Sequence, residues 1–174
     1  MTTSLPGWFF DVYPVENGMA VWILGDDGRA YQCFDPFHPS FYLHLDARDE
    51  KRIPALLQRC RIPAIIGREQ KLELFSGEEW QVSKITVHNP LRFNHCVWSL
   101  QKFLPHFAFY NSNIPVAQMY LYDRQVFPLA RCTFTISENN TLERITLQDS
   151  FDAHQYQVPE LKIMRLRNGT TEHS

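Results

Sequence analysis

The feature that most restricts the fold of this chain is a pair of turn signals near its N-terminus, each set between apolar runs. Asn17-Gly18 separates residues 8–13 from residues 19–24, and both runs are rich in aromatic and β-branched residues. Asp26-Asp27-Gly28 then leads into a third run of this kind, residues 29–34. Asn-Gly and Asp-Gly dipeptides favour the positive backbone φ angles of tight hairpin turns. The sequence therefore predicts an antiparallel meander of three strands.

The middle of the chain predicts a second unit, in which strands alternate with two amphipathic helices. Apolar residues recur at helical spacing along one side of each helix. The expected order is strand 41–45, helix about 49–60, strand 62–68, strand pair 71–75 and 80–88, helix 89–104 and strand 107–110. This order is β-α-β-β-α-β with one strand doubled. It is typical of a ferredoxin-like or RNA-recognition-like unit, whose two helices cover one face of an antiparallel sheet.

The C-terminal part predicts a further hairpin, made of residues 132–137 and 142–147 around Glu138-Asn139-Asn140. A last apolar run at 161–166 follows Pro159, and the polar tail at 168–174 is expected to fray. The length of 174 residues suits one domain. We divide it into a β meander (1–40), a ferredoxin-like unit (41–130), a C-terminal hairpin and strand (131–167) and the tail. The expected fold class is α+β, with a barrel-like antiparallel sheet beside the ferredoxin-like unit.

The residue types needed for catalysis or metal binding do not come together in the sequence. The four cysteines are far apart, and the seven histidines show no spacing that suits a metal site. Acidic residues occur as adjacent pairs, which suit turns or a solvated face, and not as the Asp-x-Glu of an editing nuclease. A phosphate-binding glycine loop and a nucleophile elbow are also missing from the sequence. We therefore expect no catalytic residue and no metal or cofactor site in this chain.

The charge balance gives no overall attraction to nucleic acid. There are 17 basic and 19 acidic residues, so any contact with a phosphate backbone must be local. Arg59, Arg61, Arg68 and Lys71 form a basic cluster near a predicted sheet edge, and we expect this cluster to bind single-stranded DNA with modest, salt-dependent affinity. No segment resembles a membrane span or a secretory signal. This predicts a soluble, cytoplasmic protein with no membrane partner.

Four motifs follow one another along the chain. They are Phe-Asp-Val-Tyr at 10–13, Asp-Pro-Phe-His-Pro-Ser-Phe-Tyr at 35–42, His-Asn-Pro at 88–90, and Tyr-Asn-Ser-Asn-Ile-Pro-Val-Ala-Gln-Met-Tyr-Leu at 110–121 with Val-Phe-Pro-Leu at 126–129. Together they span about residues 9–130 and resemble the N-terminal domain of family B DNA polymerases, in which an Ile-Pro opens a short helix. Each motif alone is weak, but four in the same order argue against coincidence.

The resemblance implies a template-facing pocket. In archaeal members of that family, the N-terminal domain samples each base of the single-stranded template in a shallow apolar slot, as base stacking requires. The matching residues here are Tyr13, Pro39, Pro90, Phe93, Ile114, Pro115, Val116 and Met119. Asn113 replaces an Asp of the family pattern, and Met119 replaces an Arg that could pair with a phosphate. Sensing of a deaminated base is therefore left open, and the same residues could instead pack the junction between the two units.

The resemblance also implies a larger parent protein. This chain alone would be a scaffold without activity, whereas the parent would be a DNA-directed DNA polymerase with 3'-5' exonuclease activity and bound Mg²⁺. Its partners would be the remaining polymerase and exonuclease domains and the single-stranded template. A second hypothesis is a free-standing RNA-recognition-like module that binds a protein or single-stranded nucleic acid. The Gly-Phe-x-Phe-like run expected on the sheet of such a module is missing, which favours the polymerase hypothesis.

Overall fold

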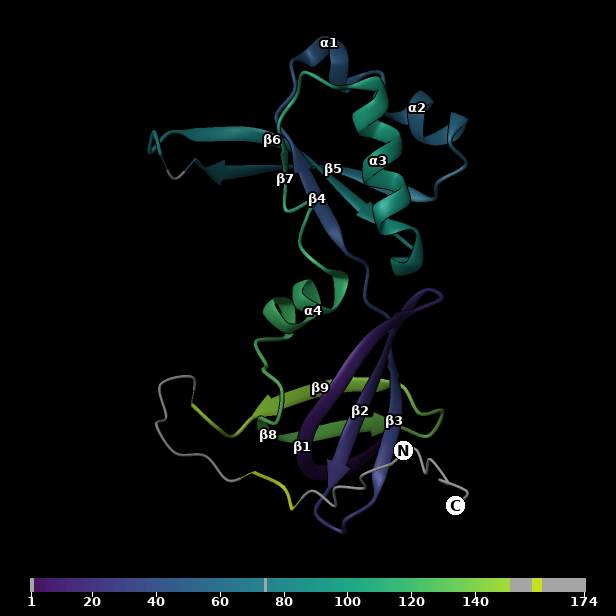
Figure 1. Ribbon diagram of the computed structural model, residues 1–174, viewed down its shortest axis with the longest axis vertical. Coiled ribbons are helices and arrows are strands. Elements are labelled where there is room, and N and C mark those ends of the chain that lie inside the picture. Colours follow the sequence, from purple (N-terminus) through teal and green to yellow (C-terminus); the bar gives the residue numbers. More distant parts are fainter. Residues whose placement is uncertain (1, 74, 151–157, 161–174) are drawn as a thin grey trace, which may run out of the picture.

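Two antiparallel sheets lie at opposite ends of an elongated molecule, with helix α4 (Val116–Arg124) between them (Figure 1). The computed structural model describes residues 2–73, 75–150 and 158–160. The predicted α+β fold class is confirmed. The apolar run expected at 161–166 and the tail at 168–174 lie outside the described residues.

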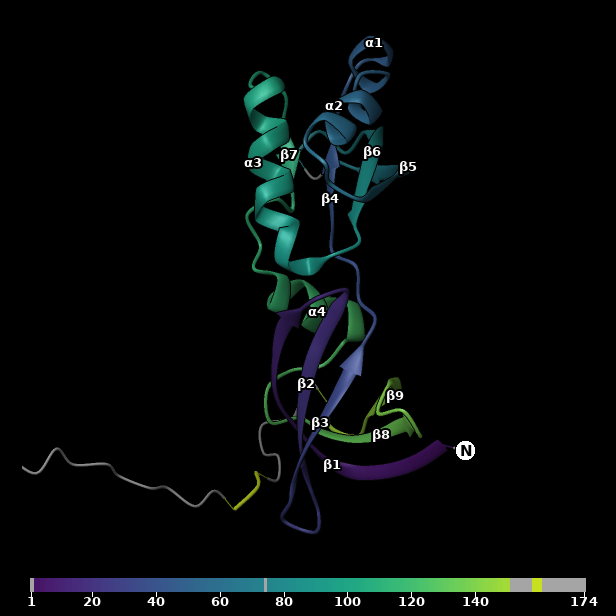
Figure 2. The same ribbon diagram turned by 90° about the vertical axis from the view of Figure 1, so that its right-hand side faces the viewer.

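The first sheet is built around one long strand, β1, and has the order β3-β2-β1-β8-β9. Its strands are β1 (Thr2–Val15), β2 (Gly18–Gly25), β3 (Ala30–Asp35), β8 (Arg131–Ser137) and β9 (Leu142–Leu147). Strand β1 pairs with β8 through its first half and with β2 through its second, and it is strongly curved (Figure 2). Asn17 and Gly28 have φ angles of 61° and 75° in the two turns. The predicted three-stranded meander is therefore confirmed, together with its turn chemistry.

The outer strands of this sheet meet at one end, which makes the sheet barrel-like. Phe34 in β3 forms a bridge with Thr141, and its N–H donates to the carbonyl of Asn140 at 3.0 Å. The Asn140 side chain in turn donates to the carbonyl of Gln32 at 3.0 Å. These contacts satisfy backbone groups that a free sheet edge would leave exposed to pairing with other chains.

The second sheet has the order β5-β6-β4-β7, and every neighbouring pair is antiparallel. Its strands are β4 (Ser40–Leu43), β5 (Ala64–Leu72), β6 (Glu79–Val87) and β7 (Phe109–Tyr110). The helices are α1 (Ala47–Glu50), α2 (Ile53–Arg59) and α3 (Phe93–Phe103), the last preceded by the 3-10 turn η1 (Pro90–Arg92). Helices α2 and α3 share one apolar core with one face of the sheet. This is the ferredoxin-like arrangement that the sequence predicts.

Two details of this unit differ from the sequence prediction. The doubled strand at 62–68 and 71–75 is a single strand, β5, because Glu69 and Lys71 continue the ladder with β6. The polar residues around Gln70 suit an exposed edge strand. The helix predicted at 49–60 is broken into α1 and α2, since Pro54 lies in the first turn of α2 and has no N–H to continue α1.

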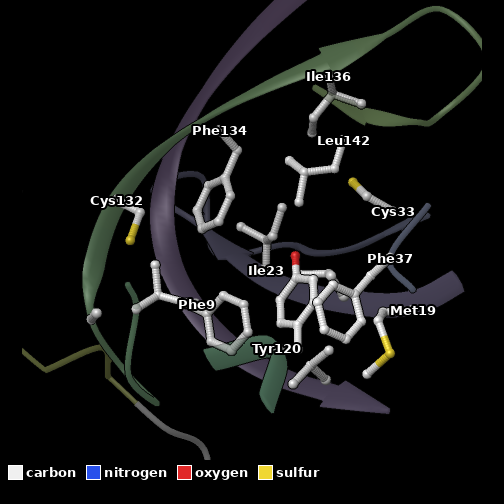
Figure 3. Close-up of a cluster of buried hydrophobic side chains, with 14 residues drawn as sticks. Phe9, Met19, Ile23, Cys33, Phe37, Tyr120, Cys132, Phe134, Ile136 and Leu142 are labelled. Atoms are coloured by element: carbon white, nitrogen blue, oxygen red, sulfur yellow. The ribbon is translucent and has the colours of Figure 1, made fainter. Parts of the chain in front are cut away.

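Helix α4 connects the two hydrophobic cores. It begins after Pro115 and ends at Gln125, whose φ of 52° is a left-handed helix cap. Its Tyr120 is fully buried in the core of the first sheet, where the ring lies between Phe9 and Phe37 (Figure 3). Val116 and Met119 of the same helix pack against both cores. The helix that the sequence division placed in the unit 41–130 therefore also completes the first core.

A buried carboxylate fixes α4 to the first sheet. Asp35, at the end of β3, is 3% exposed and accepts a hydrogen bond from the Tyr120 hydroxyl at 2.8 Å. Arg124 donates to both oxygens of the same carboxylate, at 2.9 and 2.7 Å. Burial raises the pKa of Tyr120, and the Asp35 charge raises it further, so the hydroxyl stays protonated and can donate. The carboxylate thus has three charge-assisted or buried bonds to one helix.

Replacing Asp35 by alanine should lower the free energy of unfolding by about 3 kcal/mol, because Tyr120 and Arg124 lose the carboxylate they share. For a chain of this size, this corresponds to a fall in melting temperature of roughly 6–12 °C. Thermal unfolding followed by circular dichroism measures the change. Asp123→Ala removes an exposed carboxylate from the same helix and serves as the control, with an expected change below about 0.5 kcal/mol. Equal melting temperatures for Asp35→Ala and the wild type would contradict the role given to this carboxylate.

Candidate nucleic-acid interface

A cavity of about 310 Å³ lies where the ferredoxin-like unit meets helix α4. We name it the junction cavity. Its lining comes from the segment before β4, from β4 and β6, and from α4 with the segment preceding it. The lining residues are Phe37, His38, Ser40, Tyr42, Lys84, Asn111, Ile114, Met119, Tyr122 and Asp123. Apolar side chains with a few amide, hydroxyl and imidazole groups are the usual composition of a small-ligand site.

Two of the eight residues predicted for a template-base pocket line this cavity, namely Ile114 and Met119. Val116, one turn before Tyr120, is half-buried and packs between the two hydrophobic cores. Pro115 is exposed and lines a different hollow, which also includes Gln118. The segment before α4 therefore offers side chains to both sides of the helix, and only part of it faces the junction cavity.

Three other predicted pocket residues are buried. Pro39 and Pro90 are inaccessible, and Phe93 is 0% exposed in the core of the ferredoxin-like unit. The Phe93 ring packs edge-on against Phe41 with centroids 5.7 Å apart. In this conformation these side chains support the fold and are not accessible to a base.

Tyr13 is not among the residues that line the junction cavity. Its neighbour Val12 belongs to the core of the first sheet, and successive strand residues point to opposite faces. Tyr13 is 39% exposed, and its hydroxyl accepts a hydrogen bond from the Gln32 side chain at 2.8 Å. The eight residues therefore do not meet in one pocket, and their proposed contact with a template base remains a prediction.

The polar groups of the junction cavity are held in place by neighbours. His38 donates from Nδ1 to the carbonyl of His88 at 2.8 Å, because a carbonyl oxygen can only accept. The Lys84 ammonium lies 2.7 Å from a carboxylate oxygen of Glu69. Asp123 is largely exposed at the opposite wall. Positive and negative groups are thus both present, so the cavity has no strong field of one sign.

The four predicted backbone-binding cations do not form a free basic patch. Arg68 donates two hydrogen bonds to Glu50, at 2.8 and 2.5 Å, and Lys71 pairs with Glu69 at 2.9 Å. Arg59 lies over the Phe103 ring, with its guanidinium carbon 5.0 Å from the centroid. Arg61 is exposed in the turn after α2, where its φ is 53°. Because two of the four cations are paired with carboxylates, their contribution to DNA binding remains a prediction.

The sequence reasoning missed a group of aromatic residues on the face of the second sheet that the helices do not cover. We name this the open face. It carries Tyr42, Trp80 and Tyr110 from three different strands. Tyr42 stands between the buried residues Phe41 and Leu43, an alternation that predicts opposite faces for neighbouring residues. That signal was available in the sequence, whereas the meeting of the three rings depends on the strand order.

Two observations concern the metal-binding residue types and the thiols in the described part of the chain. Residues 2–73, 75–150 and 158–160 contain no group of three or more His, Cys, Asp or Glu side chains that could hold a metal ion. All four cysteines are free. Burial raises the pKa of Cys96 and of Cys132 to about 12, which keeps both thiols protonated and poorly reactive near neutral pH. Among the described residues, the helices are too short or too polar to span a membrane.

The fold of this chain is shared with part of a known polymerase. No protein-family model matches the chain, and no curated protein matches it. Among solved structures, the family B DNA polymerase from the hyperthermophilic archaeon Pyrobaculum calidifontis is similar, with a TM-score of 0.64 and 18% sequence identity. The similarity covers 84% of this chain and 21% of that polymerase, so the chain spans about a fifth of its length. At this identity the likeness concerns the fold alone.

The Glu50–Arg68 pair predicts how stability responds to acid. Hydrogen bonds from Arg68 hold the pKa of Glu50 below its ordinary value of 4.5. A carboxyl group whose pKa is lower in the folded than in the unfolded state stabilises the fold at pH values above its unfolded-state pKa. This stabilisation is lost as the pH falls through its folded-state pKa. Glu50→Gln should therefore flatten the fall in melting temperature below about pH 4.5, and Arg68→Gln should have the same effect. Melting curves across this range measure it, and identical slopes in wild type and both variants would refute the pairing.

Proposed function

We propose that this chain is the N-terminal, non-catalytic platform of a family B DNA polymerase, and that it faces the single-stranded template in DNA replication or repair synthesis. The observation that carries the proposal is the agreement of two independent signals. Four sequence motifs resemble that domain in order, and the whole fold is similar to part of a polymerase of the same family over 84% of this chain.

Such a platform would act through its shape and its surface contacts, and not through reactive groups. It would hold the template strand and dock against the polymerase and exonuclease domains of its parent, which would bind the Mg²⁺ that phosphoryl transfer requires. The described residues offer no acidic cluster of that kind themselves. A cytoplasmic location follows from this role as an expectation.

The junction cavity is the proposed template contact of the platform. A volume of about 310 Å³ accommodates one nucleobase, with Ile114 and Met119 as apolar contacts. Asn111 and His38 carry groups that can meet the edge of a base, as single-strand recognition requires. Met119 supplies no cation, so we expect the contact with the strand to be weak and to tolerate different bases.

The second hypothesis, a free-standing RNA-recognition-like module, keeps one structural observation in its favour. The βαββαβ unit has the topology of such modules, and its open face carries aromatic side chains despite the missing Gly-Phe-x-Phe run. The reading frame around this chain separates the two hypotheses. We expect it to continue beyond Ser174 into a strand with Asp-x-Glu and later an Asp-Thr-Asp-like motif. A stop codon directly after Ser174 would favour the free-standing module.

A single substitution tests the junction cavity as a template contact. Met119→Arg restores the cation of the family pattern and should tighten binding of a labelled oligothymidylate about fivefold to tenfold at about 50 mM salt, as measured by fluorescence anisotropy. It should also steepen the slope of log K against log salt concentration by about one, because one more counterion is released on binding. Gln118→Arg is the matched control, because it adds the same charge to the neighbouring position, which faces the hollow beside Pro115. Equal tightening by both variants, or none by Met119→Arg, would count against this cavity as the contact.

A further inference from the structure

We propose that the open face of the second sheet carries a separate stacking site for an unpaired nucleobase of single-stranded nucleic acid. The site is a cavity of about 360 Å³, distinct from the junction cavity. Its lining residues are Tyr42, Lys71, Leu72, Glu73, Phe75, Trp80, Val82, Tyr110 and Asn111. The proposal goes beyond the platform function, since it concerns another cavity and would hold for a free-standing module as well.

The strand order brings the aromatic rings together. Tyr42 in β4 pairs directly with Tyr110 in β7 on one side and with Lys84 in β6 on the other. Trp80 pairs with Lys71 next to the turn of the β5–β6 hairpin. This hairpin projects from the sheet (Figure 1). Residues paired across strands point to the same face. Tyr42 and Tyr110 are therefore neighbours on the open face, and the hairpin closes one end of the cavity.

The rings are available for stacking to different degrees. Tyr110 is 39% exposed, and Phe75 at the hairpin tip is 100% exposed. Trp80 is held on one side by the His44 ring, with centroids 4.4 Å apart. Tyr42 is half-buried, and the Lys71 ammonium lies 5.0 Å from its ring centroid. Phe75 lies in the hairpin turn, outside the strands. Among the aromatic rings that the strands contribute to the cavity, Tyr110 is the most exposed, and we assign the stacking contact to it.

The charges beside the cavity are of both signs. The Glu69 carboxylate lies 2.9 Å from the Lys71 ammonium and 2.7 Å from the Lys84 ammonium. Glu73 also lines the cavity, and Glu78 accepts a hydrogen bond from the Trp80 ring nitrogen at 3.3 Å, so carboxylates offset the two ammonium groups. Binding at this site would therefore depend on stacking, and the Asn111 amide can meet the base edge.

A base fits this site better than an added peptide strand. Strand β7, the sheet edge next to Tyr110, is only two residues long and cannot template a further strand over any length. Stacking on aromatic rings is a usual means of holding unpaired bases with little sequence preference. The cavity volume also accommodates a base with its sugar.

The two cavities adjoin each other. Tyr42 and Asn111 line both of them, so one bound strand could contact both cavities. A single strand bound to this chain would then place successive nucleotides along β4. We expect a longer oligonucleotide to bind more tightly than one that can reach only one cavity.

The test is anisotropy with labelled oligothymidylate and oligouridylate at about 50 mM salt. Tyr110→Ala should weaken binding about tenfold, whereas Tyr110→Phe keeps the ring and should stay within about twofold of the wild type. Phe10→Ala, which removes an exposed aromatic ring from the first sheet, is the matched control and should have no effect. Circular dichroism melting curves establish that each variant is folded. The DNA and RNA arms distinguish the two sources of the strand.

The outcomes separate this inference from the proposed function. If Tyr110→Ala binds like the wild type while Met119→Arg still tightens binding, the stacking site is overturned and the junction contact stands. If Tyr110→Ala weakens binding and Met119→Arg changes nothing, the stacking site stands and the junction contact fails. Equal affinity for duplex and single strands would overturn the stacking site, because a paired base cannot enter the cavity. Failure of the wild type to bind any single strand would overturn it as well.

Discussion

The arrangement of the molecule depends on the buried carboxylate of Asp35. It sits where the chain leaves the first sheet for the ferredoxin-like unit, and Tyr120 and Arg124 bind it from the helix on which the chain returns. The segment that leaves the first sheet and the helix that returns to it are therefore joined at Asp35. A buried ion pair often adds little net stability compared with apolar packing, but it penalises every arrangement that leaves a partner unpaired. Here that penalty fixes α4, and with it one wall of the junction cavity.

The contacts of Asp35 with α4 also preserve the geometry of the two proposed binding surfaces. Helix α4 supplies Met119 and Tyr122 to the junction cavity, and the segment before it supplies Asn111 to both cavities. Strand β4 contributes Tyr42 between them. None of these groups is a strong nucleophile or part of a metal-binding cluster among the described residues. The contacts that these groups can make are stacking, hydrogen bonding and weak charge attraction, which suit the proposed holding of a strand.

Local signals predicted most of the fold, and long-range contacts account for what they missed. Asn17-Gly18 and the two helical periodicities were sufficient for the meander and the βαββαβ order, since turn chemistry and amphipathicity act over a few residues. Pro54 was present in the sequence but was overlooked as a helix break. The pairing of Asp35 with Arg124 spans 89 residues and has no local signature. For the same reason, the motifs indicated Tyr13 and Phe93 as pocket residues, but local sequence could not predict that the Tyr13 side chain is partly exposed and that Phe93 is buried in a core.

The pairing of β1 with both β2 and β8 has a consequence for how the protein folds. The ferredoxin-like unit is inserted between β3 and β8, so the first sheet is completed only by residues that follow the whole insertion. The insertion contains its own core and can collapse early, whereas the edge of β1 that pairs with β8 stays unpaired until β8 has been synthesised. Non-local strand pairing of this kind slows folding and exposes the unpaired edge to association with other chains. During synthesis the meander and the insertion can each form from local contacts, whereas the first sheet is completed only after β8 has emerged, and chaperones that shield strand edges would act on this protein chiefly before that point.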